Sequence, residues 1–402
     1  MPPGLDGQAR PSGREAPARD RGEVMMLAVD GREFVPGRVT GIGRFLVGLL
    51  HEIARSRPHL QTVVVAGREE SIPVAAPHLR VHRLPPCPTL VWDQILLPRA
   101  LRQVKATAFF SPYYKAPLRA PCPTVVTIHD LIPLRFPAYS RGRWRLFAAT
   151  FRPWAALLAR RAAAVITDSA HSKSDLLALL GLDAERVHVI PIGVPEEFRP
   201  ALPPESVAAA AARYGVHRPY ILAVGNFLPH KNLPRLVEAY SLLPTLLRED
   251  VRLVLAGSPG GHGPARPVDR AALIRPGVVL PGFIAPEDLP LLYAGATALV
   301  CPSLAEGFGL PVLEAMACGT PVVCARAGAL PEVAGDAAIY VDPSDVRSIA
   351  SGLHRIVEDE GLRRDLAARG LARARLFNAR KTTARLVDLL EHIARGREGR
   401  EG

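Results

Sequence analysis

The chain of 402 residues lacks the features that would place it across a membrane or in an oxidising compartment. No run of about eighteen apolar residues occurs. The nearest stretch, residues 146–167, is interrupted by Arg152, Pro153, Arg160 and Arg161, which argues against a spanning helix. The five cysteines form no CxxC pair, and their odd number argues against a disulfide framework. We therefore expect a reducing, cytoplasmic setting.

Motifs for nucleic-acid binding are also missing. The sequence shows no zinc-ligand spacing, no RNP-like aromatic strand and no helix-turn-helix, so we expect no nucleic-acid partner. The net charge of +12 also fits an anionic membrane face or phosphorylated ligands. Much of this charge lies in arginine runs on predicted helices. Two interpretations of it therefore remain: solvated helix faces, or a docking surface.

The length and the alternation of apolar runs predict two α/β domains. A chain this long exceeds what one hydrophobic core usually serves. Short β-branched runs separated by helical patterns predict parallel sheets covered on both faces. The predicted strands of the first series are residues 24–30, 62–67, 123–130, 163–169 and 187–193. Those of the second are residues 220–226, 251–258, 277–283, 296–303, 320–325 and 337–342.

The domain boundaries follow from composition. Residues 1–22 are rich in proline, glycine and arginine without an apolar segment, which predicts a disordered tail rather than a signal peptide. We expect a Rossmann-like N-terminal, acceptor-side domain over residues 23–198 and a linker over 199–218. These are followed by a Rossmann-like nucleotide-sugar-binding domain over residues 219–374. The chain ends in a crossover helix and its tail over residues 375–402.

The stretch LAEGFGLPVLEAMACG, residues 304–319, holds two glutamates around a glycine-flanked turn. It follows the predicted strand 296–303 and opens a helix, with Pro311 suited to the first helical position. Free backbone N–H groups at such a helix start bind anions, typically phosphate. The carboxylates of Glu306 and Glu314 accept hydrogen bonds, so hydroxyls are their natural partners. A nucleoside-diphosphate sugar offers both chemistries.

Two other interpretations of the glutamates stay in view. Glu314 has the place of an ordinary first-turn glutamate that favours the helix dipole, but this leaves Glu306 and the glycines unexplained. An acid–base pair of a glycosidase requires carboxylates that bracket a scissile bond, whereas these bracket an anion site. The donor-site interpretation is the one that accounts for all of these residues.

Two consecutive segments resemble the E-x7-E signature of retaining GT-B glycosyltransferases of family 4: EGFGLPVLEAMACGTPVV and the following GALPEVAGDAAIYVDPSD. The resemblance covers nearly the whole chain from Val24 to about residue 396. Further matching segments occur in order: VDGREFVPGRVTGIGRFLVGLL, WDQILLP, VVTIHDLIP, ITDSAHSKSDL, VIPIGV and ILAVGNFLPHKNL. The implied fold is GT-B, with two Rossmann-like domains facing across a cleft and a C-terminal helix that crosses back to the N-terminal domain.

The resemblance also implies the donor site. Glu306 is expected to hold hydroxyls of the transferred sugar, Glu314 those of the ribose, and Lys231 to face the diphosphate. The remaining donor-binding residues that it implies are Gly225, Asn226, His230, Gly307, Phe308, Gly309 and Leu310. His230 stands where the family often carries an arginine, so either another arginine substitutes or phosphate binding is weaker and more dependent on pH.

The acceptor side is expected to involve residues of the first domain. His129 ends an apolar strand; a lone histidine is more often structural, but the resemblance places it at the donor sugar as a catalytic residue with Glu306 and Lys231. Asp130 is expected to orient a loop or the imidazole. Gly41 and Gly43 resemble the flexible cleft loop of the family. Arg44 either meets an anionic acceptor or is a solvated helix residue.

The implied reaction retains the configuration at the anomeric carbon and needs no metal or cofactor. The acceptor attacks from the face that the diphosphate leaves, and the leaving phosphate takes the proton. GDP-mannose is the expected donor, and a glycan or a polyprenyl-linked glycan the expected acceptor. An epimerase of the same fold and a catalytically silent nucleotide-sugar-binding protein remain as alternatives.

A peripheral place on the inner face of the membrane is a further alternative. Residues 141–161 combine arginines with Trp144, Phe147, Phe151 and Trp154, a composition suited to an anionic membrane surface. The aromatics also recur at helical spacing, which favours a helix that uses them as core.

Overall fold

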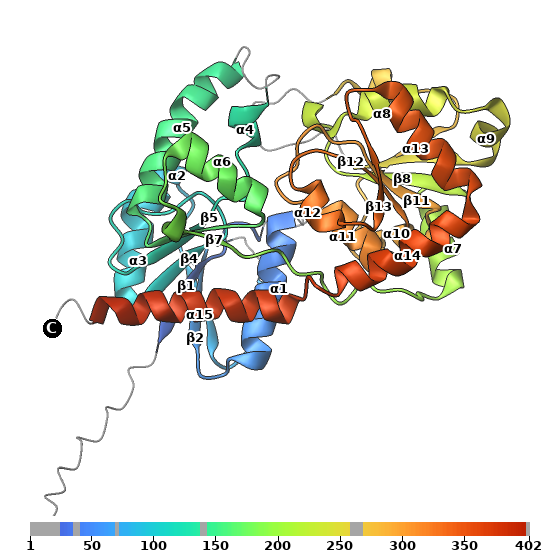
Figure 1. Cartoon of the computed structure of the whole chain (residues 1–402). Coiled ribbons are helices and arrows are strands. Elements are labelled where there is room, and N and C mark those ends of the chain that lie inside the picture. The colour runs from blue at the N-terminus through green and yellow to red at the C-terminus, as the bar shows by residue number, and fades with distance from the viewer. Residues whose placement is uncertain (1–24, 35–40, 69–71, 137–142, 258–267, 399–402) are drawn as a thin grey trace, which may run out of the picture.

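The computed structural model describes residues 25–34, 41–68, 72–136, 143–257 and 268–398, and these form two parallel sheets with helices on both faces (Figure 1). The predicted tail 1–22 lies outside the described residues. The two-domain α/β architecture that the sequence predicts is confirmed.

The first sheet has the strand order β3-β2-β1-β4-β5-β6-β7 within the described residues. Its strands are β1 Met26–Asp30, β2 Gln61–Ala66, β3 Leu79–Arg83, β4 Ala108–Ser111, β5 Thr124–Thr127, β6 Ala164–Thr167 and β7 Val187–Val189. β3 and β4 were not predicted. β3 is an edge strand whose residues LRVHR are largely exposed, and β4 has only four residues, so neither shows a long apolar run.

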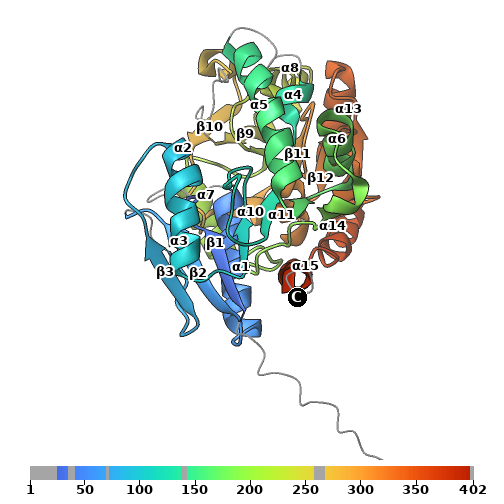
Figure 2. The ribbon, with the colours of Figure 1, turned by 90° about the vertical axis from the view of Figure 1, so that its left-hand side faces the viewer.

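Two layers of helices cover this sheet (Figure 2). α1 (Gly41–Ser56) and α15 (Ala379–Glu398) pack on one face. α3 (Leu97–Gln103), α5 (Arg143–Arg161) and α6 (Ala170–Leu180) pack on the other. The shorter elements are α2 Thr89–Val91, the π-helix η1 Trp92–Leu96, α4 Ile132–Arg135 and η3 Ala184–Arg186.

The aromatic residues of α5 belong to the core of the first domain. Phe151 is buried, and Phe147 stacks on it with ring centroids 5.2 Å apart. Arg152 and Arg160 donate hydrogen bonds to the carbonyls of Leu179 and Leu180 at the end of α6. The described side chains of α5 therefore support the core interpretation of this helix over a membrane-facing one.

The second sheet has the order β10-β9-β8-β11-β12-β13 in the part of the chain that the structure describes. Its strands are β8 Tyr220–Val224, β9 Arg252–Ala256, β10 Val278–Gly282, β11 Ala298–Cys301, β12 Val322–Ala325 and β13 Ala338–Val341. Its helical elements are α7 Pro204–Arg213, η4 Pro229–Lys231, α8 Leu233–Ser241, α9 Thr245–Asp250, η5 Arg270–Leu273, α10 Leu289–Gly295, α11 Leu310–Ala317, α12 Leu330–Ala334, α13 Val346–Glu358 and α14 Glu360–Ala374.

The segment predicted as a linker, residues 199–218, contains α7, which packs on α10. Ala211 and Val216 share a core cluster with Tyr220 and Tyr293 of the second domain. An alanine-rich helix of this kind buries its small side chains against a neighbouring helix. This part of the connection therefore packs as a layer of the second domain.

The C-terminal helix α15 crosses back to the first domain, along the lower side of the molecule in Figure 1. Leu386, Val387 and Leu390 are buried in the core that β1 and α1 also form. The crossing is fixed where Val194 N donates to Phe377 O at 2.9 Å and Thr382 Oγ1 donates to Pro191 O at 2.8 Å. The expected crossover is thus confirmed.

Each sheet reverses its strand order once at a switch point, between β1 and β4 and between β8 and β11. Ligands of open α/β sheets bind outside the carboxyl ends of the strands at such points. The residues after β8 and β11 include Lys231 and Glu306. Among the described residues, no helix is both long and apolar enough to cross a bilayer.

We predict that Leu390→Ala destabilises the protein by about 2–4 kcal/mol, because it removes a fully buried side chain and leaves a cavity. The exposed neighbour Arg385 provides the control, and Arg385→Ala is expected to change stability by less than about 0.5 kcal/mol. Urea unfolding measures both. Equal midpoints for the two variants would show that α15 is not part of the core.

Candidate active site

An ion pair at the switch point of the second sheet forms the centre of the site. Lys231 ends η4 after β8, and Glu306 follows β11, so neighbouring strands bring them together. Lys231 Nζ lies 2.7 Å from Glu306 Oε1. Ser303 Oγ donates to the same oxygen at 2.6 Å. Both of these hydrogen bonds use Oε1 of Glu306, and a carboxylate has the capacity to accept further ones.

The backbone of Glu306 is held by the loop before α12. Ala329 N donates to Glu306 O at 3.0 Å. Gly328 has φ +57, and a Cβ there would lie 2.5 Å from the same carbonyl oxygen, so only glycine fits. The segment GALPEV therefore serves to position Glu306.

The charges of this pair are mutually stabilised. Burial alone raises the pKa of Glu306, but the Lys231 ammonium and the hydrogen bonds of Lys231 and Ser303 lower it overall. Burial alone lowers the pKa of Lys231, and the Glu306 carboxylate raises it overall. Both groups are thus charged at neutral pH, with donors on Lys231 remaining for a diphosphate.

His230 does not supply a substitute cation. Burial, followed by the charge of Lys231, lowers the pKa of its imidazole to about 4. Its ring meets the Phe136 ring of the first domain edge-on, with centroids 6.4 Å apart. Its carbonyl accepts a hydrogen bond from Leu304 N at 2.7 Å. At neutral pH His230 is therefore an uncharged packing residue between the domains.

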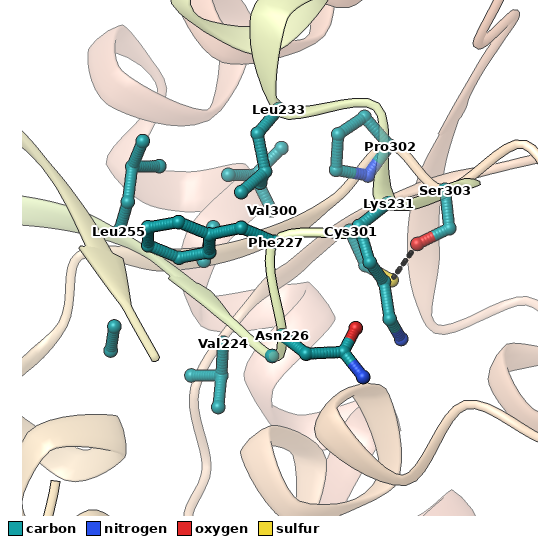
Figure 3. A pocket seen from close by; sticks show the side chains of 13 residues that line it. Val224, Asn226, Phe227, Lys231, Leu233, Leu255, Val300, Cys301, Pro302 and Ser303 are labelled. Atoms are coloured by element: carbon teal, nitrogen blue, oxygen red, sulfur yellow. Dashed lines mark hydrogen bonds between the residues drawn. The ribbon is translucent and has the colours of Figure 1, made fainter. Parts of the chain in front are cut away.

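A small pocket adjoins the ion pair (Figure 3). Phe227, Leu233 and Leu255 form its apolar part, and Gly225 lines it after β8. Figure 3 shows the polar ends of Asn226 and Lys231 lying close together. Asn226 Oδ1 is buried without a hydrogen-bond partner among the described residues. The predicted residues Gly225, Asn226 and Lys231 thus line one pocket.

Glu314, one turn into α11, is engaged from both domains. Its Oε1 lies 3.0 Å from Arg44 Nη2 of α1, and its Oε2 accepts from Tyr293 OH at 2.9 Å. Burial raises the pKa of Glu314, and Arg44 with Tyr293 offsets part of this. The structure therefore places Arg44, expected on the acceptor side, against the carboxylate expected to hold the ribose.

The glycine-rich segments of the two domains lie close together. A Cβ on Gly41, the first residue of α1, would lie 3.4 Å from Leu310 Cδ1 at the start of α11. Gly43 is buried in the first turn of α1. Phe308 is buried against the Phe377 ring, with centroids 5.8 Å apart, and Gly309 has φ +106 at the start of α11. The α1 and α11 starts thus face one another.

His129 lies after β5 and is held by Asp168 rather than by Asp130. Its Nδ1 is 2.7 Å from Asp168 Oδ2, and its Nε2 is 3.0 Å from the carbonyl of Pro112. Burial lowers the pKa of the imidazole, but the Asp168 carboxylate and the carbonyl raise it to about 9 overall. His129 is therefore a cation that donates from both ring nitrogens at neutral pH.

Asp130 orients the loop and not the imidazole. Its Oδ1 accepts from Ile132 N at 3.0 Å at the start of α4. Burial raises its pKa, and Glu306 and Asp168 add to this, while the Ile132 hydrogen bond and His129 oppose it. Of the two roles expected for Asp130, the structure shows the first, and Asp168 takes the second.

The loop between the two glutamates docks on the first domain. Ser169 Oγ and Ser172 Oγ of α6 donate to Gly307 O at 2.7 and 3.0 Å. A Cβ on Gly307 would lie 2.6 Å from the Asp130 side chain. Gly307 is thus a contact point between the domains, because only its missing side chain permits this approach.

Glu332 strengthens the same contact. Its two carboxylate oxygens accept from Ala170 N at 2.8 Å and from His171 N at 2.6 Å. Glu332 itself lies in α12 of the second domain, and the helix start that it contacts, that of α6, belongs to the first domain. A carboxylate at this N-terminus is stabilised by the free amides and the helix dipole.

Sequence reasoning did not assign roles to Asp168, Ser169, Ser172, Tyr293 or Ser303. Ser169 is the N-cap of α6, and a serine before an apolar run is a recognisable capping signal. No comparable signal marks Tyr293, whose contact with Glu314 is long-range. The described residues contain no cluster of three or more His, Cys, Asp or Glu side chains arranged to hold a metal.

Two family matches cover most of the chain. Residues 39–198 match glycosyltransferase family 4, and residues 212–373 match the glycosyl transferases group 1. The chain belongs to the group 1, family 4 glycosyltransferases. Membership in a transferase family favours this activity over the epimerase and the silent binding protein.

Relatives and solved structures agree with this assignment. The chain is 33% identical over 293 residues to the O-antigen chain mannosyltransferase B of Escherichia coli, covering 72% of this chain and 75% of that protein. It is 33% identical over 248 residues to a D-inositol 3-phosphate glycosyltransferase of Xylanimonas cellulosilytica, covering 59% and 58%. The Anabaena protein HepE, solved with UDP and glucose, has a TM-score of 0.72 at 21% identity, covering 92% and 100%.

We predict that Glu332→Gln lowers kcat/KM for glycosyl transfer on the order of tenfold, because one charged hydrogen-bond acceptor at α6 is lost. Asp336→Asn is the control, because that carboxylate is 83% exposed and lies just past the end of α12, the helix that carries Glu332. Steady-state assays measure the effect, while nucleotide binding to the second domain is expected to stay unchanged. Identical kinetics of the two variants would contradict the role of Glu332.

The His129–Asp168 pair predicts a pH-dependent stability. The raised pKa of His129 stabilises the fold fully below about pH 6.5, and this contribution is lost as pH rises through about 9. Asp168→Asn is therefore expected to cost on the order of 2 kcal/mol at pH 6.5 and less at pH 9.5. Thermal unfolding at the two pH values measures it, with Asp288→Asn, which breaks the ion pair of this buried carboxylate with the exposed Arg213, as control. A cost that is equal at both pH values would contradict the pair.

Proposed function

We propose that the enzyme transfers mannose from GDP-mannose to a glycan, with retention of configuration at the anomeric carbon. The observation that carries the proposal is the Lys231–Glu306 pair beside a pocket at the switch point of the second sheet. The mannosyl group is supported by the similarity to the O-antigen chain mannosyltransferase B of Escherichia coli.

The arrangement suits a donor whose charged and hydroxylated parts are recognised separately. Lys231 and the start of α11 favour the diphosphate. The Glu306 carboxylate suits a sugar hydroxyl, and Glu314 suits the ribose hydroxyls. The two carboxylates carry cationic partners in Lys231 and Arg44, which reduces their repulsion of the diphosphate.

The proposed reaction is a front-face displacement. The acceptor oxygen forms a bond to the anomeric carbon as the bond from that carbon to the diphosphate breaks. The hydroxyl proton passes to the leaving phosphate oxygen. Lys231 stabilises the negative charge that develops there, and the closed domains exclude water that would hydrolyse the donor.

The His129 cation lies on the opposite side of the site. Together with the Asp168 carboxylate, His129 forms a pair whose net charge is close to zero. The imidazole is therefore suited to donate a hydrogen bond to the sugar or to the acceptor without a strong electric field of its own. We propose that His129 orients the sugar by donating a hydrogen bond from Nε2, after the hydrogen bond from Nε2 to the Pro112 carbonyl has broken. The acceptor glycan, free or polyprenyl-linked, then approaches along the first domain.

We predict that Glu306→Gln lowers kcat roughly 10²–10³-fold, because one acceptor of the charged network becomes a donor. The exposed Glu360, 69% accessible, provides the matched control Glu360→Gln with unchanged rate. The assay uses labelled GDP-mannose and UDP-glucose with α-mannobiose, and NMR of the product reports the anomeric configuration. An inverted product, or full activity of Glu306→Gln, would overturn the proposal.

A further inference from the structure

The switch point of the first sheet carries a second cluster of charged side chains. Asp30 ends β1, and Arg32 follows it directly. The neighbouring strand β4 leads to Tyr113. The π-helix η1 brings Trp92 and Asp93 to the same place. A crevice between neighbouring strands of opposite crossover direction is where an open α/β sheet receives a ligand.

Arg32 is held by two carboxylates. Its Nε lies 3.0 Å from Asp30 Oδ1 and its Nη1 lies 2.7 Å from Asp93 Oδ1. Its guanidinium carbon lies 5.4 Å from the centre of the Trp92 ring. The side chain of Arg32 is 15% exposed, and those of Asp30 and Asp93 are almost fully buried. The three groups carry a net charge of −1, so the guanidinium is already neutralised.

The WDQ segment builds this cluster. Trp92 lies under the guanidinium and Asp93 pairs with it. Gln94 Oε1 accepts from Leu118 N at 3.0 Å, which ties the loop after β4 to η1. π-helices are rare and occur frequently at functional sites. Trp92 Nε1 is buried without a hydrogen-bond partner in the part of the chain that the structure describes.

The surroundings extend the negative charge. Burial, then Asp30, raises the pKa of Asp93, while Arg32 and Lys115 oppose the shift. Burial and Tyr114 raise the pKa of the Tyr113 hydroxyl, and the negative charges of Glu33 and Asp130 raise it further. This hydroxyl donates a hydrogen bond to Tyr114 OH at 2.6 Å. The half-buried members Tyr113, Tyr114 and Lys115 provide the accessible face. The described carboxylates Asp30, Glu33, Asp93 and Asp130 outnumber the cations Arg32 and Lys115, and the adjacent His129 cation is balanced by Asp168.

We propose that this cluster at the β1–β4 switch point is the acceptor subsite and that it selects an uncharged, hydroxylated sugar over a phosphorylated one. The inference rests on the proposed function and adds the acceptor class. Carboxylates accept hydrogen bonds from sugar hydroxyls, and tyrosine hydroxyls both accept and donate them. A phosphate brought to the same place meets a net negative field and a guanidinium already committed to two carboxylates. The Xylanimonas relative is named for D-inositol 3-phosphate, a phosphorylated substrate of the kind that this field disfavours.

The test is a binding titration that does not depend on the donor. α-Mannobiose and α-mannobiose 6-phosphate, which differ only in the phosphate, are titrated into the GDP-bound full chain by ligand-observed NMR. For the wild type we expect the neutral disaccharide to bind on the order of tenfold tighter. Asp93→Asn removes one charge and keeps the shape, so the preference is expected to shrink severalfold.

Asp175→Asn is the matched control, because Asp175 is a buried carboxylate of the same domain whose Oδ1 pairs with Arg135 Nη2 at 2.6 Å. It is expected to leave the preference unchanged. Trp92→Phe is a second variant that keeps an aromatic side chain and removes the indole N–H, which has no hydrogen-bond partner among the described residues; it is expected to weaken binding of the neutral disaccharide. The melting temperature, measured alongside, reports any loss of packing at this buried position.

The inference would be overturned if the wild type bound the phosphorylated disaccharide as tightly as the neutral one or more tightly, or if it bound neither. It would also be overturned if Asp93→Asn and Asp175→Asn changed the preference equally. A fourth contradicting result is that neither Trp92→Phe nor Asp93→Asn changes disaccharide binding. Failure of the proposed function is distinguishable, because it appears as absent transfer in an enzyme that still discriminates the two disaccharides.

Discussion

The contact between Gly307 and the start of α6 is the interaction on which the site depends. Two serine hydroxyls of the first domain hold the carbonyl of Gly307, and Glu332 of the second domain occupies the next two amides of the same helix. These hydrogen bonds engage groups that a helix start leaves without intrahelical partners. They also fix the residue next to Glu306, so domain closure and the position of the Glu306 carboxylate are set together.

The electrostatics of the cleft follow from burial. Glu306 and Glu314 are nearly inaccessible, and a buried carboxylate is costly unless it is paired and hydrogen-bonded. Lys231 meets the first within its own domain, whereas Arg44 reaches the second from the opposite domain. A nucleoside-diphosphate sugar must share or displace these partners. Opening the domains would leave Glu314 without its cation, which favours the closed arrangement.

The alternation of strands and helices was predictable from β-branched runs. The place of Glu306 and Glu314 around a helix start after a strand was predictable from their spacing, whereas their donor-binding roles stay a prediction. β3 and β4 were missed because an edge strand is polar and a four-residue strand carries little pattern. Asp168 as the partner of His129, Tyr293 as the partner of Glu314 and Glu332 at α6 were not predictable. Each joins residues far apart in the sequence, and no local periodicity reports such a contact.

The central claim is that Glu306 binds the transferred sugar while Lys231 serves the diphosphate. A crystal structure of the enzyme with GDP-mannose tests it most directly. The account predicts a sugar hydroxyl within hydrogen-bond distance of Glu306, a phosphate oxygen at Lys231 Nζ and the ribose at Glu314. A sugar bound away from Glu306, with the Lys231–Glu306 pair unchanged and the diphosphate held elsewhere, would contradict it.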